Sequence, residues 1–123
     1  MVPHFSNAEL ECKCGCGMLP TWALANKLEG LRIAYGRQLK VTSAARCPTY
    51  NAKVSLSGLN GPHTTGEAVD IAIFGKEAWV LLAIAFSMGF TGIGVSQKGP
   101  NRFIHLDTLQ GTPTQPRPTI WSY

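Results

Sequence analysis

Long apolar runs, runs of basic residues and acidic side chains are all scarce in this 123-residue sequence. Its longest apolar stretch, residues 78–90, has about 13 residues, fewer than the roughly 20 that a membrane-spanning helix needs. The 11 Lys and Arg residues give a net charge of +4 but are scattered, whereas nucleic-acid sites cluster basic and aromatic side chains. We therefore expect no membrane insertion and no nucleic-acid binding, and we interpret residues 78–90 as a buried helix. The diffuse positive charge favours a polyanionic substrate.

Low-complexity tails and a secretory signal are also missing. The first ten residues have neither the basic start nor the apolar segment of a signal peptide. Hydrophobic residues make up 45% of the chain and charged residues 15%, a balance typical of globular domains. Because domains most often have about 100–150 residues, we expect residues 1–123 to form a single domain. We also expect the protein to act as a monomer.

Cysteine is limited to four residues, Cys12, Cys14, Cys16 and Cys47. The alternate spacing in ECKCGCG lacks the C-x-x-C pattern of common zinc sites. A four-thiolate zinc site completed by Cys47 is one interpretation, but we favour a single disulfide to Cys47, or reduced thiols. In each case we expect the cysteines to be structural and to tether the N-terminal segment to the segment after Arg46.

Apolar periodicity predicts two main helices. The first covers residues 20–36, between Pro20 and Gly36, and its apolar face consists of Leu24, Leu28, Leu31 and Tyr35. The second covers residues 75–88, and its apolar face consists of Trp79, Leu82 and Phe86.

Strands are predicted in residues 38–41, 68–74, 90–96 and 102–108, and a short helix is predicted after Pro48. Gly99 and Pro100 supply a hairpin turn between the last two strands. The proline-rich residues 111–123 are predicted to be irregular. This order indicates an α+β domain with a mostly antiparallel sheet under two main helices.

The chain has only two aspartates, and each lies close in sequence to a histidine. His63 precedes Asp70 in GPHTTGEAVDI, and His105 precedes Asp107 in FIHLD. Asp70 interrupts a strand that is otherwise apolar on both faces, so we expect it to be buried. A buried carboxylate costs several kcal/mol unless a cation or hydrogen-bond donors compensate it.

A divalent metal held by His63, Asp70 and His105 would meet that need, because two imidazoles and one carboxylate with an open fourth position recur in catalytic zinc sites. Side chains alternate along a strand, so Asp107 should share the face of His105. Two simpler interpretations stay open, in which His63 caps a turn and Asp107 is an exposed strand residue.

Ordered motifs extend over nearly the whole chain: HFSNAELECKCGCG, TSAARCPTYN, GPHTTGEAVDI, GIGVSQKGPNRFIHLDT and RPTIWSY. The third resembles the His-x-x-Gly-x-Ala-x-Asp motif of the M15 peptidases, zinc D-alanyl-D-alanine carboxypeptidases and peptidoglycan endopeptidases with a Hedgehog-like fold. The second resembles the family's arginine-bearing segment, and the fourth its closing hairpin with His-x-Asp. The two ends resemble those of phage-borne members.

The resemblance implies Zn²⁺ held by His63, Asp70 and His105. It also implies that Arg46 grips a substrate carboxylate, a task that suits the bidentate fork of arginine. The general base would be Asp107, or with less support Glu67, taking a proton from a water whose pKa the zinc lowers. Asp107 could instead orient a ligating histidine.

The function implied by the resemblance is hydrolysis of peptide bonds in peptidoglycan stem peptides or cross-links, by carboxypeptidase or endopeptidase action. The protein would be a phage lysis enzyme (endolysin), made in the host cytoplasm without a signal peptide and acting on the cell wall. The alternative is a non-catalytic, metal-bearing domain that binds the wall or forms part of a virion.

Two positions depart from the family pattern. Many relatives have serine two residues before the motif histidine, where this chain has Gly61. Some place a catalytic acid three residues before the second histidine, where this chain has Arg102. The first departure puts a hydrogen bond near the site in doubt, and the second leaves the base open.

Overall fold

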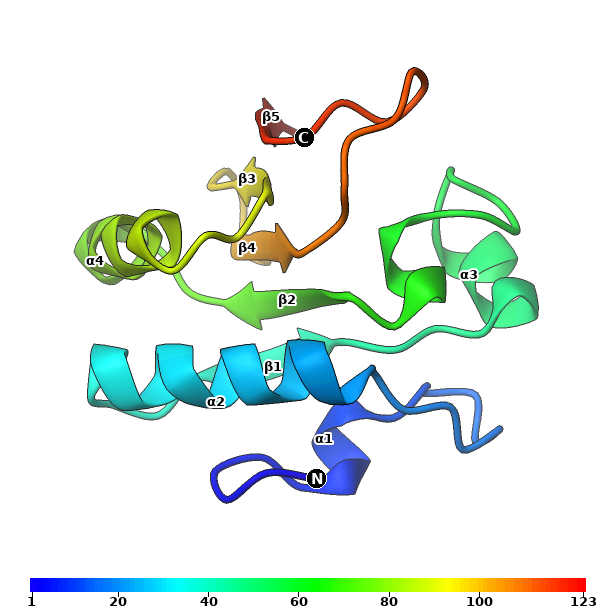
Figure 1. The fold of residues 1–123 in the computed structure, drawn as a ribbon, viewed down its shortest axis with the longest axis horizontal. Coiled ribbons are helices and arrows are strands. Elements are labelled where there is room, and N and C mark those ends of the chain that lie inside the picture. The colour runs from blue at the N-terminus through cyan, green and yellow to red at the C-terminus, as the bar shows by residue number, and fades with distance from the viewer.

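A computed structural model of residues 1–123 shows a mixture of helices and strands (Figure 1). In chain order the elements are α1 (Asn7–Leu10), α2 (Trp22–Tyr35), β1 (Lys40–Ser43), α3 (Pro48–Val54), the 3₁₀ helix η1 (Pro62–Thr65), β2 (Ala68–Ala72), α4 (Gly75–Ser87), β3 (Gly92–Ser96), β4 (Phe103–Asp107) and β5 (Thr119–Ser122). No helix combines the length and the apolarity needed to cross a membrane.

The strands form one sheet in the order β1-β2-β4-β3-β5. Figure 1 shows them stacked from β1 below to β5 above, beside the C-terminus. Every neighbouring pair is antiparallel except β3 and β5. The prediction of an α+β fold with a mostly antiparallel sheet is confirmed, as is the hairpin between β3 and β4.

The prediction that residues 111–123 are irregular is wrong for Thr119–Ser122, which form the edge strand β5. Its sequence, TIWS, places two apolar residues in succession, so it lacks the alternation of apolar and polar residues that predicts a strand, although the burial of its residues alternates. Its register comes from backbone pairing with β3, where Ile93 lies opposite Ile120 and Gly94 opposite Trp121. Such long-range pairing is not readable from local sequence.

Helix α2 has clear start and stop signals. The Thr21 hydroxyl accepts a hydrogen bond from the Leu24 N–H, and Gly36 ends the helix at φ 81°, a left-handed conformation that glycine adopts without strain. Leu24, Leu28 and Leu31 are fully buried, as predicted.

Helix α4 was predicted with the wrong buried face. Trp79 and Phe86 are 79% and 59% exposed, and the buried side chains are those of Ala78, Leu81 and Ala85. Almost every residue of AWVLLAIAF is apolar, so the pattern does not single out one face. Two alanines on the buried face let the helix approach its neighbours closely.

The two faces of the sheet have different roles. Val69, Ile71, Ile104 and Leu106 are buried in one core cluster with the leucines of α2 and with Leu81 of α4. Side chains alternate along a strand, so Asp70 on β2 and the two polar residues of β4 lie on the opposite face. One face of the sheet holds the core and the other holds polar chemistry.

Candidate metal centre

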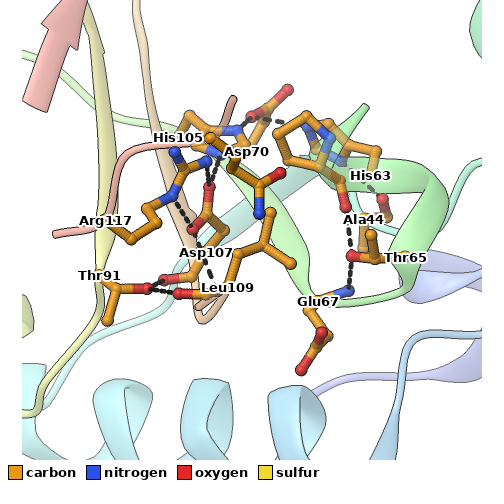
Figure 2. Close-up of polar contacts among 12 residues, drawn as sticks. Ala44, His63, Thr65, Glu67, Asp70, Thr91, His105, Asp107, Leu109 and Arg117 are labelled. Atoms are coloured by element: carbon orange, nitrogen blue, oxygen red, sulfur yellow. Dashed lines mark hydrogen bonds and ion pairs between the residues drawn. The ribbon is translucent and has the colours of Figure 1, made fainter. Parts of the chain in front are cut away.

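His63, Asp70 and His105 converge on one point above the sheet (Figure 2). Strand pairing places Asp70 directly opposite His105. Asp70 Oδ1 lies 3.2 Å from His63 Nε2 and 3.1 Å from His105 Nδ1. One ligand atom from each residue lies within 4.8 Å of the others, and all three residues are buried. The structure therefore brings together the three residues predicted as metal ligands.

The short helix η1 carries His63 to this point. Pro62 occupies its first turn, and Gly66 ends it at φ 76°, where the Gly66 N–H donates to the His63 carbonyl. A Cβ on Gly66 would lie 3.3 Å from the Thr21 backbone nitrogen, so a side chain there would be both strained and crowded. The Arg46 N–H also donates to the His63 carbonyl, at 3.2 Å.

Each histidine uses its second ring nitrogen to donate to a fixed acceptor. His63 Nδ1 donates to the Ala44 carbonyl at 2.7 Å, and His105 Nε2 donates to Asp107 Oδ2 at 2.8 Å. With a metal bound, the nitrogens that face Asp70, His63 Nε2 and His105 Nδ1, could direct their lone pairs at it. Metal-ligating histidines in proteins are held in this way, so the donor set fits a divalent metal.

Electrostatics at the cluster favour a cation. Burial alone would raise the pKa of Asp70, but hydrogen bonds and charges from His105 and His63 hold it well below its usual range. Burial would lower the pKa of His105, but hydrogen bonds to Asp107 and Asp70 raise it. The Asp70 carboxylate is thus ionised beside the Arg46 guanidinium, and a divalent metal would be a second cation that it could bind.

Asp107 lies on the far side of His105 from Asp70 (Figure 2). Its side chain is completely buried and forms a bidentate ion pair with Arg117, with Nε to Oδ1 at 2.9 Å and Nη2 to Oδ2 at 2.8 Å. Burial raises the pKa of Asp107, but the hydrogen bonds from His105 and Arg117 lower it to about 2. This placement argues against the predicted role as general base and favours the alternative, that Asp107 orients His105.

Glu67, the other candidate base, is directed away from the cluster in Figure 2. Its backbone N–H donates to the Thr65 hydroxyl at 3.1 Å, and its side chain does not line the cavity above the metal centre.

That cavity has a volume of about 340 Å³. The aromatic side chains of Phe103, Trp121 and Tyr123 line this cavity, and so do Ser55, Ser57 and Arg46. Asp70 is the only acidic side chain in the lining. A substrate entering here would meet the three candidate metal ligands directly.

Arg46 is held in the cavity wall by three side chains. Its Nε donates to Ser43 Oγ at 2.9 Å, Nη1 to Asn51 Oδ1 at 3.2 Å and Nη2 to Asp70 Oδ2 at 3.4 Å. Its side chain is only 16% exposed. The guanidinium is therefore fixed in the cavity wall beside the candidate metal ligands, and its role in gripping a carboxylate stays a prediction.

The structure shows what surrounds the two positions that depart from the family pattern. A Cβ on Gly61 would overlap the hydroxyl of Ser57, which instead accepts a hydrogen bond from Asn51 Nδ2 at 2.8 Å. The Ser57 hydroxyl thus occupies the space that a side chain at position 61 would fill. Arg102 stacks its guanidinium 3.8 Å from the centre of the Phe74 ring and does not line the metal cavity.

Three residues of the C-terminal segment contribute to the site and were not predicted from the sequence: Arg117, Trp121 and Tyr123. The Trp121 ring lies 5.1 Å from the His105 ring, and Trp121 and Tyr123 line the cavity. A signal was present in the glycines of β3: a Cβ on Gly92 would overlap the Asp107 carboxylate, and one on Gly94 would lie 2.7 Å from the Trp121 indole nitrogen. Two glycines on one face of a strand indicate that large groups pack over it.

Comparison with curated proteins gives no match. The family model described as Peptidase M15 matches residues 3–107, which include every residue of the metal centre and exclude Arg117, Trp121 and Tyr123. Members of this family are metal-dependent peptidases. Because the match spans most of the chain and the candidate ligands converge in the structure, the protein belongs to the Peptidase M15 family.

Proposed function

We propose that the protein is a zinc peptidase that hydrolyses peptide bonds in peptidoglycan stem peptides or cross-links. The observation that carries the proposal is the convergence of His63 Nε2 and His105 Nδ1 on Asp70 Oδ1 at the base of a cavity. When bound there, zinc would polarise the scissile carbonyl and lower the pKa of a coordinated water. Two imidazoles and one carboxylate leave a coordination position open for this chemistry.

The residues around the candidate metal ligands bind the stem peptide and orient the ligands. Arg46 presents a fixed guanidinium to the cavity and pairs with a carboxylate of the stem peptide. Trp121 and Tyr123 cover one side of the cavity with aromatic rings, which reduces the access of water to the bound peptide. Asp107 is a positioning residue, because it holds the His105 ring with Nδ1 toward Asp70 and is itself held by Arg117.

The biological setting that we propose is lysis by a phage. Support comes from the resemblance of HFSNAELECKCGCG and RPTIWSY to the ends of phage-borne family members. The net charge of +4 suits an anionic wall polymer. In this setting the protein is made in the host cytoplasm and acts as a monomer on the wall.

A second candidate function is that of a metal-bearing domain that binds the wall without cleaving it. The observation that favours it is that Asp70, a candidate metal ligand, is the only acidic side chain lining the cavity. Neither Asp107 nor Glu67 reaches this space to act as a base.

Mass spectrometry of purified muropeptides separates the two functions. We expect the zinc-loaded protein to release alanine or to split cross-linked dimers, and this also identifies the bond. A chelator or the substitution His63→Ala should stop the reaction. His4→Ala is the matched control, because His4 pairs with Glu29 of α2 and has no part in the metal centre. Binding of muropeptides without products would favour the second function, and products that persist with chelator would overturn the zinc mechanism.

A further inference from the structure

A second cluster of metal-ligating side chains lies outside the site described above. The sulfur atoms of Cys12, Cys14, Cys16 and Cys47 all lie within 4.8 Å of one another. The Sγ atoms of Cys12 and Cys14 are 3.4 Å apart, and those of Cys14 and Cys47 are 3.6 Å apart. All four cysteines are free.

These distances match a shared metal ion better than a disulfide. A disulfide brings two sulfur atoms to about 2.05 Å and leaves the other two cysteines without a role. Four thiolates at about 2.3 Å from one zinc ion, at tetrahedral angles, lie about 3.8 Å apart. The two separations in the structure, 3.4 and 3.6 Å, lie close to the second value.

Two glycines shape the backbone so that alternate cysteines meet. In an extended strand, side chains at every second position would be about 7 Å apart. Here Gly15 and Gly17 adopt φ values of 86° and 85°, which turn the chain after Cys14 and again after Cys16. The Cys12 N–H donates to the Met18 carbonyl at 2.8 Å and closes the turn. The left-handed glycines therefore bring the cysteines together without a C-x-x-C spacing.

The backbone also supplies hydrogen bonds to the sulfur atoms. The Cys47 N–H donates to Cys12 Sγ at 3.3 Å, and the Tyr50 N–H donates to Cys47 Sγ at 3.4 Å. Donors of this kind favour the thiolate form and are the usual outer partners of metal-bound ligands. Cys47 receives the second bond because it is the N-cap residue of α3.

We propose that Cys12, Cys14, Cys16 and Cys47 bind a second zinc ion as a closed, four-thiolate structural site. The proposal rests on the thiol cluster and not on the proposed function. Such an ion would join the N-terminal segment to the start of α3, at the residue after Arg46. Asn51 of α3 accepts a hydrogen bond from Arg46, so this zinc would also fix one wall of the cavity.

Zinc content per chain tests the proposal. Protein expressed with zinc and purified under reducing conditions should carry about two zinc ions, measured by inductively coupled plasma mass spectrometry. The double variant Cys14→Ala/Cys16→Ala should carry about one. Cys14 and Cys16 are exposed, so this variant should fold, which circular dichroism checks. His63→Ala is the reciprocal control and should also lose one ion.

Cobalt substitution identifies which site is lost. The wild type and His63→Ala should show the thiolate-to-cobalt charge-transfer band in the near ultraviolet, and the double cysteine variant should not. Equal zinc content in the wild type and the double cysteine variant would overturn the proposal. A thiol titration showing that two of the four cysteines form a disulfide in the zinc-loaded protein would also overturn the proposal. If the protein shows the thiolate-to-cobalt band but does not hydrolyse muropeptides, that result would count against the proposed function and not against the cysteine site.

Discussion

The histidine cluster and the cysteine cluster solve the problem of gathering ligands in different ways. His63, Asp70 and His105 are buried, come from a sheet and a short helix, and face a cavity of about 340 Å³. The cysteines lie at a turn near the surface, where Cys14 and Cys16 are exposed. Three ligands leave a metal with an open position, whereas four thiolates close it. The comparison separates a centre suited to chemistry from one suited to cross-linking.

The contacts that hold the ligands in place also differ between the two clusters. In the histidine cluster both rings are oriented by side-chain or carbonyl acceptors, and Arg117 supports one of those acceptors. In the cysteine cluster the supporting groups are backbone N–H donors. His105 can therefore be altered by single substitutions behind it, whereas His63 and the cysteines are altered mainly through the ligands themselves.

The largest expected effect is that of Asp70→Asn, which keeps the shape of the side chain and removes its charge. We expect the loss of one zinc ion and a fall in muropeptide hydrolysis of about 10³-fold or more, since the metal supplies several kcal/mol of transition-state stabilisation. The cobalt–thiolate band of the cysteine cluster should remain. Hydrolysis within tenfold of the wild type would show that Asp70 is not a ligand.

Next in size is Arg117→Met, which leaves the fully buried Asp107 carboxylate without its cation. We expect a loss of about 3–5 kcal/mol in the free energy of unfolding, measured by urea denaturation, because an uncompensated buried charge is strongly destabilising. Arg37→Met is the control, since Arg37 is exposed and stacks only over Tyr35. Its effect should be below about 1 kcal/mol. Equal effects of the two substitutions would mean that the ion pair does not support the histidine cluster.

Removing the cysteine cross-link should have a somewhat smaller effect. In a His63→Ala background, Cys14→Ala/Cys16→Ala should lower the free energy of unfolding by about 3–4 kcal/mol. This is the chain entropy of a loop closed across the 35 positions from Cys12 to Cys47. Calorimetry should show Tm lower by roughly 10 °C. Chelator should lower the Tm of the His63→Ala protein and leave the Tm of the triple variant unchanged. An equal fall in Tm in both proteins would contradict the cross-link.

Asp107→Asn tests the positioning role with a smaller expected effect. As a partner that orients His105, Asp107 should change zinc affinity at the histidine cluster by about 10–100-fold, and excess zinc should restore most of the turnover. A general base would instead show normal zinc binding with turnover lower by roughly 10²–10⁴-fold. Titration with zinc while hydrolysis is followed distinguishes the two.

The smallest expected effect concerns Glu29, a second anchor of the N-terminal segment. Glu29 accepts a hydrogen bond from the His4 N–H at 2.9 Å and pairs with the His4 ring. Burial raises the pKa of Glu29, but the hydrogen bonds from His4 lower it below its ordinary 4.5. A lowered carboxyl pKa contributes stability that is present above pH 4.5 and lost as the pH falls through the lowered value.

Glu29→Gln should therefore cost about 1–2 kcal/mol at pH 7, and this cost should shrink in acid. Urea denaturation at pH 7 and at pH 3 measures both values. An unchanged cost at pH 3 would contradict the role of the Glu29 charge. A smaller effect than that of the cysteine substitutions would identify the thiol cluster as the stronger anchor of the N-terminal segment.

Much of the histidine cluster could be predicted from the sequence because local patterns carry it. Asp70 is conspicuous as a charge in an apolar strand, and the spacing from His63 crosses a turn marked by Gly66. The fold class followed from the order of periodic segments. The buried face of α4 could not be predicted, because a helix with nearly uniform hydrophobicity has no favoured side until its neighbours are in place.

The sequence by itself determined the element order, the α+β class and the residue types available to bind metal, because these depend on periodicity and composition. Only the tertiary structure decided that Asp107 lies behind His105, that Arg117 pairs with Asp107 while Trp121 lies beside the His105 ring, and that four cysteines share one point. Those arrangements depend on strand pairing between distant residues and on glycine conformations at Gly15 and Gly17. Neither leaves a periodic trace in the sequence, since each is fixed by contacts that form only when the chain folds.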